Sequence, residues 1–445
     1  MKKEVFKKYD IRGKWPNEIN ENFVKEFAGA FLRYLNREVF RQTQSKILIS
    51  RDREEVSKKA YEILKKELVK LGGEVIDGRE MMISAHNFVS GTQKTDGAVM
   101  VTASHLPKNY TGFKLSKNGT EPVKPEEILK FWGNKEIDSC HVYRQADSEY
   151  KKGDYLKEYI DFLVEGVKLK KEWRVAIDVA GGVAEKVFNE VLKKFKKIKV
   201  EKICFGKCEH GDGPLEKKNW KEIKKIVLKK KLDLGIMVDG DGDRIVFFDE
   251  EGKFIEPSST LAVLASEMKL NGFVGNVNIG MAVREETNKF FETKTGHIYI
   301  REEMRKRGAE IGGEHSGHIY FKRNFYAEDP IYAFLKMLEI LEKKGEKLSE
   351  AVLESDPYFK SGEINFKMTD KRFGEIKEEI KKQSKKPFDL AQGKILEIDG
   401  VKISGKDWWM SLRKSHTEDL VRLNVEAKEK KELEKIVKEV RKLIR

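Results

Sequence analysis

The class of fold is indicated by one stretch, Leu234-Gly235-Ile236-Met237-Val238, which runs directly into the loop Asp239-Gly240-Asp241-Gly242-Asp243-Arg244. A continuous apolar run that ends in a glycine-rich polar loop is typical of a buried strand in a parallel sheet. The three carboxylates alternate with glycines that let the backbone curl, so they can converge on a hard cation such as Mg²⁺. A calcium EF-hand is excluded, because Arg244 stands where that loop needs glycine. The loop therefore predicts a metal site formed by its three aspartates.

The pattern of a strand followed by a helix extends in both directions from this loop. Apolar runs at Ile47–Ile49, Ala98–Val101 and Val175–Ile177 predict further strands, and amphipathic segments follow two of them at residues 60–71 and 187–195. Alternation of this kind is typical of α/β domains with mainly parallel sheets. We therefore expect an α/β protein.

Domain boundaries are predicted by three stretches that are polar or rich in turn-forming residues. They lie near residues 138–154, 250–252 and 356–362. Beyond the last of them the pattern changes to a strand, a helix, short strands and a final amphipathic helix, which is typical of an α+β domain. The predicted domains are three α/β domains with mixed sheets and a smaller C-terminal α+β domain, over residues 1–150, 151–250, 251–358 and 359–445.

Composition excludes several classes of protein. The chain has 445 residues, of which 39% are hydrophobic, so it can build real cores and is not dominated by disorder. No apolar run approaches the roughly 20 residues that cross a bilayer, and no signal peptide opens the chain. We therefore expect a cytoplasmic protein without a membrane partner.

The charge pattern argues against a nucleic-acid partner. The net charge is +14, but many lysines alternate with glutamates, as in Lys428–Lys435. Such mixed faces are usually solvated surface, although a basic field also attracts small anions such as sugar phosphates. The three cysteines are too few for a disulfide framework, and Cys204 and Cys208 lack a second close pair that would complete a zinc site. We interpret them as small buried residues in a reducing compartment.

Three further loops carry side chains suited to chemistry. Ser104 follows the strand at Ala98–Val101, and the carboxyl ends of parallel strands face the crevice where α/β proteins bind ligands. Gly312–His318 combines glycines with hydrogen-bonding side chains, and Arg413–Thr417, with Arg422 nearby, has the charges and hydroxyls that suit a phosphate dianion. Taken singly, these loops could also be a serine helix cap, a polar turn and a basic surface turn.

Together the four loops resemble the α-D-phosphohexomutase superfamily, and most closely its phosphomannomutase/phosphoglucomutase branch. The motifs come in the order of that family and extend over nearly the whole chain. Phe6–Gly13 and Asn109–Lys114 are similar to the family's opening segment and to the stretch after its active serine. Thr295–His297 and Tyr326–Asp329 resemble further family segments.

The resemblance implies four domains around a central cleft and a phosphoryl group carried by Ser104. It implies intramolecular phosphoryl transfer that interconverts mannose or glucose 6-phosphate and 1-phosphate through a bisphosphorylated sugar, in a monomer or a homodimer. Mg²⁺ would be held by Ser104, Asp239, Asp241 and Asp243. The other implied site residues are Arg12, His105 and Lys114 for catalysis, Arg244, His297, Glu314, Ser316 and His318 for the sugar, and Arg413, Ser415, Thr417 and Arg422 for phosphate.

Departures from the family pattern concentrate in the phosphate loop. Lys414, His416 and Asp419 replace the family's prolines and asparagine, so the role of His416 stays open. Phosphoglucosamine mutase is an alternative inside the family, although His315 stands where that branch typically has glutamine. A catalytically silent sugar-phosphate-binding protein and a polyanion-binding protein are alternatives of other classes.

Overall fold

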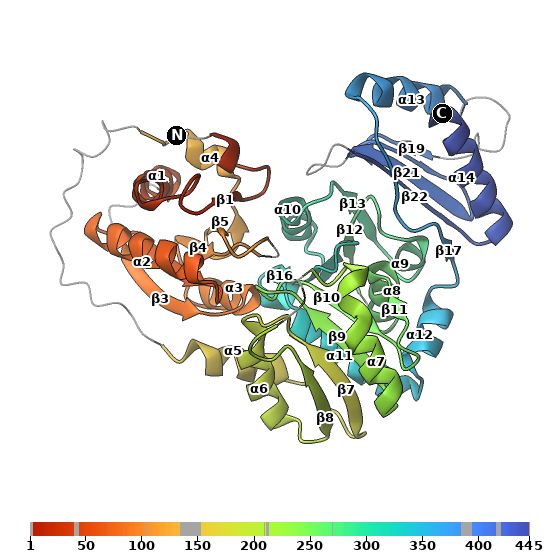
Figure 1. Cartoon of the computed structure of the whole chain (residues 1–445), viewed down its shortest axis with the longest axis horizontal. Coiled ribbons are helices and arrows are strands. Elements are labelled where there is room, and N and C mark those ends of the chain that lie inside the picture. The colour runs from red at the N-terminus through yellow and green to blue at the C-terminus, as the bar shows by residue number, and fades with distance from the viewer. Residues whose placement is uncertain are drawn as a thin grey trace.

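The computed structural model describes residues 3–39, 44–104, 106–133, 153–208, 210, 213–268, 270–383, 394–414 and 420–444. The elements form four successive sheet-containing units, which Figure 1 shows in sequence order from red to blue. The first three units pack against one another, and the C-terminal unit lies at one side of them (Figure 1). None of the helices in the described ranges combines the length and the apolar composition needed to cross a membrane.

The first sheet has the strand order β1-β5-β4-β2-β3, with β6 paired to β5. Strands β2, β3 and β4 are parallel, whereas β5 runs antiparallel to β4 and to β1. The elements are η1 (Lys3–Val5), β1 (Ile11–Lys14), α1 (Glu21–Val39), β2 (Lys46–Arg51), α2 (Glu55–Lys70), β3 (Glu74–Glu80), α3 (Ile83–Thr92), β4 (Gly97–Val101), β5 (Tyr110–Lys117), β6 (Glu121–Pro122) and α4 (Pro125–Leu129).

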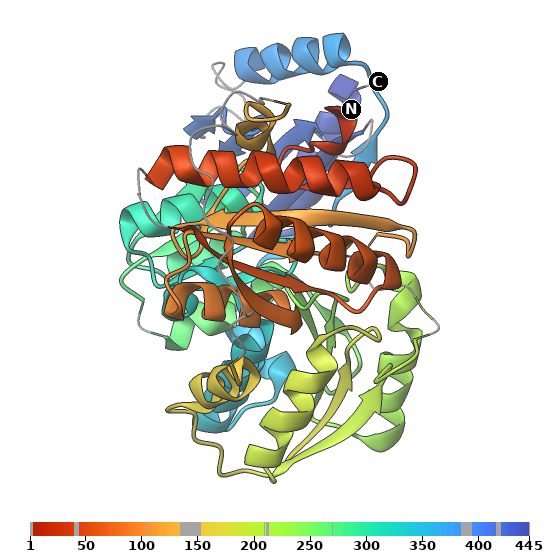
Figure 2. The ribbon, with the colours of Figure 1, turned by 90° about the vertical axis from the view of Figure 1, so that its left-hand side faces the viewer.

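Helices cover both faces of this sheet, which explains its nearly continuous apolar strands. Ile47, Ile49 and Val99 point into the core shared with α1 and α2. Leu48 and Ala98 alternate with these residues along the same strands, so they point to the opposite face, into the core on the side of α3. Figure 2 shows α1 and α2 lying across the outer face of the sheet.

The second sheet has the order β11-β10-β9-β7-β8. Strand β7 is parallel to β8 and β9, and β10 runs antiparallel to β9 and β11. The elements are α5 (Tyr155–Val164), β7 (Trp173–Asp178), α6 (Ala184–Lys194), β8 (Ile198–Ile203), η3 (Lys217–Trp220), α7 (Lys221–Lys230), β9 (Leu234–Val238), β10 (Ile245–Phe248) and β11 (Phe254–Ile255).

The third sheet has the order β13-β12-β14-β15-β16 and is also mixed. Its elements are α8 (Pro257–Glu267), β12 (Phe273–Asn276), α9 (Met281–Glu285), β13 (Phe290–Thr293), α10 (His297–Arg307), β14 (Ile311–Gly313), β15 (Ile319–Phe321), η4 (Lys322–Asn324), β16 (Ala327–Glu328), α11 (Pro330–Lys344) and α12 (Leu348–Ser355). One hydrophobic cluster contains residues of all three sheets, from Leu48 through Ile236 to Ile311, so these units share a core.

The C-terminal unit has a core of its own and an entirely antiparallel sheet, with the order β17-β22-β21-β20-β19 and β18 paired to β22. Its elements are β17 (Phe359–Lys360), β18 (Ile364–Phe366), α13 (Asp370–Gln383), β19 (Lys394–Leu396), β20 (Val401–Ser404), β21 (Trp408–Lys414), β22 (Val421–Ala427) and α14 (Lys430–Ile444). The buried Lys402 joins it to the third unit, since its Nζ donates to Val277 O at 2.6 Å and to Glu292 Oε1 at 2.7 Å. The predicted fold class, three mixed α/β sheets and a small α+β unit, is confirmed.

Candidate active site

Ser104 lies in the loop that leaves the carboxyl end of β4, in the middle of the first sheet. Its φ of 55° is uncommon for a residue other than glycine, so the surrounding loop has to hold it. The Ser104 N–H donates to Thr102 Oγ1 at 2.8 Å, and the Ala103 N–H donates to Asp52 Oδ2 at 3.0 Å. These bonds fix the loop, and Ser104 is 6% exposed. His105, predicted as its neighbour in catalysis, lies outside the described residues.

Arg12 and Lys114 reach this loop from two adjacent strands. Arg12 on β1 donates through Nη1 to Ala103 O at 2.8 Å and through Nε to Asp10 Oδ2 at 2.6 Å. Opposite it on β5 stands Gly112, where a Cβ atom would lie 2.0 Å from the Ile11 carbonyl oxygen. The close approach of the two strands therefore needs glycine at this position.

Lys114 connects the first unit to the aspartate loop of the second. Its Nζ donates to Asp241 Oδ2 at 2.7 Å and to Asp243 Oδ2 at 2.5 Å. Thr102, two residues before Ser104, also donates through Oγ1 to Asp241 Oδ2 at 3.3 Å. The sequence predicted that the serine loop and the aspartate loop follow two different strands, and in the structure the two loops are in direct contact.

The aspartate loop presents carboxylate oxygens to one point. Asp239, Asp241 and Asp243 each offer a ligand atom, and these atoms lie within 4.8 Å of one another. Gly242, at a φ of 72°, supplies the curl that only glycine adopts readily. Asp239 Oδ1 accepts the backbone N–H groups of Asp243 and Arg244, both at 3.0 Å. The buried atoms Asp239 Oδ2 and Asp241 Oδ1 accept no hydrogen bond from any described residue.

The electrostatics of this loop favour a cation. Burial raises the pKa of Asp239 well above its usual range, and the charges of Asp243 and Asp241 raise it further. Burial also opposes the charged form of Asp243, but Lys114 and His318 outweigh it and hold its pKa well below the usual range. Burial disfavours the Lys114 cation, yet Asp241 and Asp243 raise its pKa. A cluster of oxygen ligands with unsatisfied buried acceptors fits Mg²⁺, which prefers carboxylates and keeps open positions.

Glu314 directly follows the carboxyl end of β14, and both of its carboxylate oxygens accept hydrogen bonds. Its Oε1 accepts the Gly296 N–H at 2.8 Å and the Asn276 side-chain amide at 3.3 Å. Its Oε2 accepts the Tyr320 hydroxyl at 2.8 Å. This carboxylate is therefore fixed in place and can orient a hydroxyl group of a bound ligand.

His318 connects the loop of Glu314 to the aspartate loop. Its Nδ1 lies 2.7 Å from Ser316 Oγ, and its Nε2 accepts from Arg244 Nε at 3.3 Å and lies 3.3 Å from Asp243 Oδ1. An isolated backbone bridge also pairs Arg244 with His318. His297 begins α10 beside them, and burial lowers its pKa well below the usual range.

One cavity of about 730 Å³ collects most of the predicted site residues. The three sheets contribute to it through loops at strand ends and through the segment before β1. Asp239 and Asp241 are fully buried and do not line it, whereas Asp243 does. The predicted residues in its lining are Arg12, Ser104, Lys114, Asp243, Arg244, His297, Glu314, Ser316 and His318.

The four successive parts of the chain match the domains of one family. Residues 3–133 match Phosphoglucomutase/phosphomannomutase, alpha/beta/alpha domain I, residues 157–252 match its domain II and residues 256–358 match its domain III. Residues 363–443 match its C-terminal domain. The chain belongs to this family. It is therefore a phosphohexomutase of the α-D-phosphohexomutase superfamily, an enzyme of the isomerase class.

Relatives extend over almost the whole chain. The phosphomannomutase of Methanocaldococcus jannaschii is 31% identical over 455 residues, 99% of this chain and 97% of the relative. That of Escherichia coli K12 is 29% identical and covers 96% of each chain. A phosphoglucomutase/phosphomannomutase family protein from Burkholderia thailandensis has the same fold, with a TM-score of 0.84 at 21% identity over 100% of this chain and 97% of that one.

A more distant likeness of fold links the chain to a structure that contains magnesium. Aspergillus fumigatus N-acetylphosphoglucosamine mutase, in complex with GlcNAc-6P and magnesium, aligns with a TM-score of 0.53 at 15% identity. The alignment covers 93% of this chain and 85% of that one.

The predicted phosphate loop of this phosphohexomutase is only partly described. Arg413 and Arg422 stand opposite each other on β21 and β22, and Glu363 lies 3.8 Å from Arg413 Nη2 and 3.4 Å from Arg422 Nε. Neither arginine is among the described residues that line the cavity. The charge of Arg413 nevertheless contributes to the pKa values of Lys8 and Tyr9, two residues that do line it. Ser415, His416 and Thr417 lie outside the described residues.

Several cavity residues were missed by the sequence analysis. Arg301, one helical turn after His297 on α10, donates through Nη2 to Asn87 Oδ1 at 3.0 Å and to Thr120 O at 2.6 Å. Glu328 lies 3.9 Å from Arg301 Nη1. His86 on α3 lines the same cavity. The only sequence signal is that α3, Ile83–Thr92, is apolar enough to be buried and yet contains His86 and Asn87.

The N-terminal segment closes another part of the cavity wall. The Tyr9 hydroxyl donates to Thr295 O at 2.7 Å, and the two residues are 286 positions apart. Gly296 permits this contact, because a Cβ atom there would lie 2.6 Å from the Tyr9 ring. The third unit and the start of the chain therefore meet directly beside His297.

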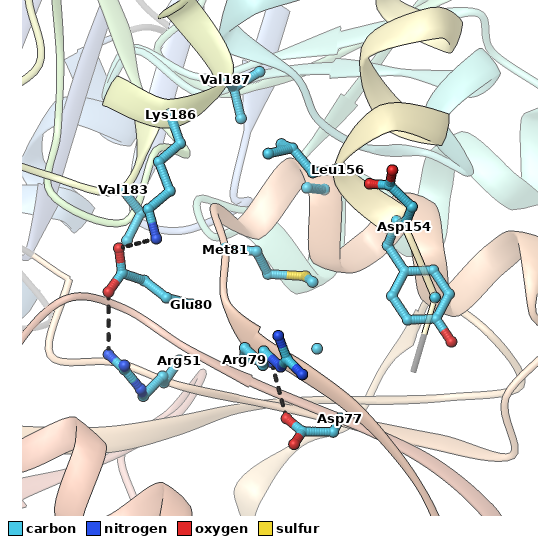
Figure 3. A pocket seen from close by; sticks show the side chains of 14 residues that line it. Arg51, Asp77, Arg79, Glu80, Met81, Asp154, Leu156, Val183, Lys186 and Val187 are labelled. Carbon is cyan, nitrogen blue, oxygen red and sulfur yellow. Dashed lines mark hydrogen bonds and ion pairs between the residues drawn. The ribbon is translucent and has the colours of Figure 1, made fainter. Parts of the chain in front are cut away.

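A second cavity, of about 630 Å³, lies between the first and second units and contains none of the predicted residues (Figure 3). Three of its charged side chains, Arg51, Glu80 and Lys186, pair with one another. Lys186 Nζ lies 2.9 Å from Glu80 Oε1, and Arg51 Nη1 lies 3.4 Å from Glu80 Oε2. This internal pairing makes it a poorer candidate for the active site.

The prediction for Cys204 and Cys208 was wrong. The two residues form a disulfide and are only half-buried, instead of being small buried thiols. Cys204 has a φ of 50° and Gly206 a φ of 94°, so the loop turns back sharply and brings the two Cα atoms to 4.7 Å. A spacing of four residues does not by itself reveal such a turn.

Proposed function

We propose that the chain interconverts the 6-phosphate and 1-phosphate of mannose or glucose through a phosphoserine at Ser104. The observation that carries this proposal is one cavity lined by Ser104, by the Lys114–Asp243 pair and by the polar loop of Glu314. A nucleophile or phosphoryl carrier, fixed cations and a set of hydroxyl-binding groups are the parts that phosphoryl transfer to a sugar requires. Family membership supports hexose phosphates as the substrate class.

In the first half of the proposed cycle, the bond between phosphorus and Ser104 Oγ breaks while a bond to a free sugar hydroxyl forms. The hydroxyl loses its proton and Ser104 Oγ gains one, so the bisphosphorylated sugar leaves an unmodified serine. In the second half the other phosphoryl group returns to Ser104 by the reverse exchange. The sugar therefore has to turn over in the cavity between the two halves.

The residues around Ser104 are suited to stabilise the charge of the transferring group. Arg12 is held by Asp10 and the Ala103 carbonyl, so its guanidinium faces the serine loop without having to reorganise. Lys114 supplies a second cation from β5, the strand between β1 and β4. Mg²⁺ bound by Asp239, Asp241, Asp243 and the phosphate on Ser104 would neutralise further charge on that phosphate.

Sugar recognition is assigned to the third unit. Glu314 is fixed by three hydrogen bonds, and Ser316 and His318 lie beside it. Such a set can accept and donate to neighbouring hydroxyl groups. Arg244 and His297 would complete this part of the cavity. Arg413 and Arg422, with Ser415 and Thr417, are proposed to bind the phosphate that does not react.

The decisive experiment compares wild type with Ser104→Ala on the 6-phosphates of mannose, glucose and glucosamine. Wild type should form mannose or glucose 1-phosphate and become labelled on Ser104 by a radiolabelled bisphosphorylated sugar. Ser104→Ala should do neither while it keeps its circular dichroism. The control Ser316→Ala removes a proposed sugar contact and the hydrogen-bond partner of His318 but leaves Ser104 in place, so it should still be labelled on Ser104.

Three outcomes would contradict the proposal. Wild-type turnover by Ser104→Ala would exclude the phosphoserine route. A preference for glucosamine phosphate would favour the phosphoglucosamine mutase alternative. Binding of hexose phosphates without any product would identify a silent binding protein.

A further inference from the structure

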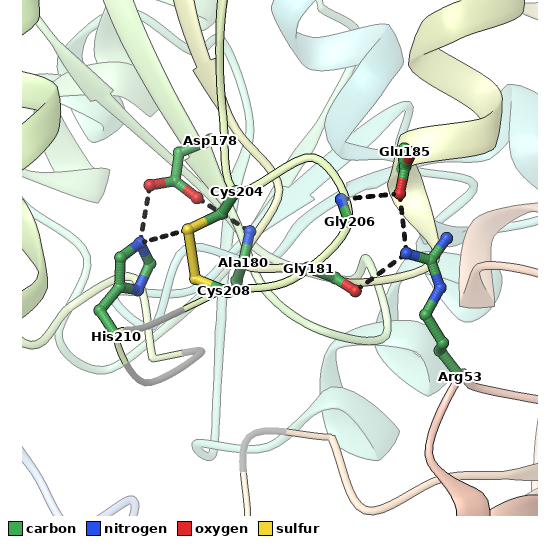
Figure 4. The surroundings of a disulfide bond; sticks show 9 residues. All are labelled: Arg53, Asp178, Ala180, Gly181, Glu185, Cys204, Gly206, Cys208 and His210. Atoms are coloured by element: carbon green, nitrogen blue, oxygen red, sulfur yellow. Dashed lines mark hydrogen bonds and ion pairs between the residues drawn. A yellow bond between two sulfur atoms is a disulfide. The ribbon is translucent and has the colours of Figure 1, made fainter.

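A second cluster of metal-binding side chains lies in the second unit and is separate from the three carboxylates of the aspartate loop. Cys204 Sγ, Cys208 Sγ and a ring nitrogen of His210 lie within 4.8 Å of one another. His210 Nε2 is 3.3 Å from Cys204 Sγ and 2.8 Å from Asp178 Oδ2. Figure 4 shows one imidazole nitrogen of His210 facing both the Cys204 sulfur and the carboxylate of Asp178.

The topology of the sheet brings these groups together. Asp178 ends β7, and Cys204 directly follows β8, the parallel neighbour in which Ile203 pairs with Asp178. Asp178 is fully buried, and its Oδ1 accepts the Ala180 N–H at 2.9 Å. Its second oxygen, Oδ2, is thereby aimed at His210. The same ring nitrogen of His210, Nε2, therefore faces both this carboxylate and the sulfur of Cys204.

We propose that, in the reduced protein, Cys204, Cys208, His210 and Asp178 bind one thiophilic divalent cation of the Zn²⁺ class. Two thiolates and one imidazole nitrogen suit Zn²⁺ and not Mg²⁺, and Asp178 Oδ2, 2.8 Å from that nitrogen, is the oxygen proposed for the fourth position. The site is therefore chemically distinct from the oxygen-only cluster of Asp239, Asp241 and Asp243.

The disulfide is the competing state of the same two sulfurs. A phosphine reductant breaks the Sγ–Sγ bond and is itself oxidised to the phosphine oxide, with oxygen taken from water, which leaves two thiols. Both thiols lose their protons when the cation binds, because the thiolate is the ligand. Disulfide and bound cation thus exclude each other.

The cation would tie together a loop that also contacts the first unit. The Gly181 N–H donates to Cys204 O at 2.8 Å, and the Gly206 N–H donates to Glu185 Oε2 at 3.0 Å. Arg53 Nη1 of the first unit lies 2.7 Å from the same carboxylate oxygen and 3.2 Å from Gly181 O (Figure 4). Binding should therefore raise the thermal stability of the reduced chain.

Titration of the reduced full-length chain with Co²⁺ tests the proposal, after removal of the reductant and in the absence of oxygen. Wild type should bind one Co²⁺ with the near-ultraviolet absorption of thiolate-to-cobalt charge transfer and with strong visible bands of tetrahedral Co²⁺, and Zn²⁺ should displace it. Cys204→Ser and Cys208→Ser should each reduce the charge-transfer absorption. Asp178→Asn should weaken binding, because it removes the negatively charged oxygen proposed as the fourth ligand.

The controls distinguish this site from other thiols and from the magnesium site. Cys140→Ser, which removes the third cysteine, should leave the cobalt spectrum unchanged. The unreduced chain should show no charge-transfer band. Absence of that band in reduced wild type, or its persistence unchanged in both Cys204→Ser and Cys208→Ser, would overturn the proposal and leave a disulfide only. Circular dichroism of each variant confirms that the fold is retained.

Discussion

His86 gives a quantitative test of how the cavity wall is built. Its Nδ1 lies 2.7 Å from Ser50 Oγ, and the side chain is 2% exposed. Burial lowers the pKa of His86 to about 3, and the cations Arg301 and Lys114 contribute to the shift. The imidazole is therefore neutral in the folded protein throughout the physiological range.

This shift makes stability depend on pH with a defined sign. An unfolded histidine has a pKa of about 6.5, so between about pH 6.5 and pH 3 the unfolded chain binds a proton that the folded chain does not. The stability that the neutral His86 side chain contributes to the fold is fully present above pH 6.5 and is lost as the pH falls towards 3. At pH 5 the loss relative to pH 7.5 is about 2 kcal/mol in the free energy of unfolding.

This loss is measured by urea unfolding of wild type and of His86→Gln at pH 7.5 and pH 5.0. The unfolding transition that shifts with the substitution is assigned to the first unit. The pKa values of Asp52 and Asp329 are raised by burial to about 6, and these groups titrate in the same range with the opposite sign. Only the difference between the two proteins therefore isolates His86. Equal losses on acidification in both proteins would refute the assignment of a buried neutral His86.

Two further predictions concern the proposed magnesium site and the proposed phosphate loop. Asp241→Asn should weaken Mg²⁺ binding in calorimetry and lower kcat by orders of magnitude, because it removes the charge of a proposed ligand and a partner of Lys114. Undiminished activity of wild type in excess chelator would contradict this prediction. Arg413→Ala should lower kcat/KM about 10- to 150-fold for 1-phosphates and 6-phosphates alike, because a lost charge-assisted contact costs about 1.5–3 kcal/mol. Arg413→Lys should recover part of the lost kcat/KM. An unchanged kcat/KM would place Arg413 outside the substrate site.

The parts of the site that could be predicted are those carried by short motifs at strand ends. Ser104 follows β4 and the three aspartates follow β9, and local pattern alone marks both positions. Resemblance of the loops to one family then supplied the roles. The α/β class could be predicted for a similar reason, because central strands such as β4 and β9 leave continuous apolar runs.

The rest depends on contacts that no local pattern encodes. Arg301 and Asn87 are 214 positions apart, and neither has a distinctive neighbourhood in the sequence. The pairing of Cys204 with Cys208 needs a left-handed backbone at Cys204, which residue type does not reveal. The sequence also does not show that Arg413 and Arg422 share Glu363 as a neighbour and are not among the described residues that line the cavity.

The hydrogen bond from Tyr9 to Thr295 has a consequence for the order of events on the ribosome. At a synthesis rate of about 5–20 residues per second, roughly 15–60 s separate the emergence of these two residues. During this interval the first sheet can already fold around its own core, because all its strands lie before residue 123. The wall of the cavity beside His297 can form only afterwards. The nascent chain therefore carries its Ser104 loop long before that loop lies in a complete cavity.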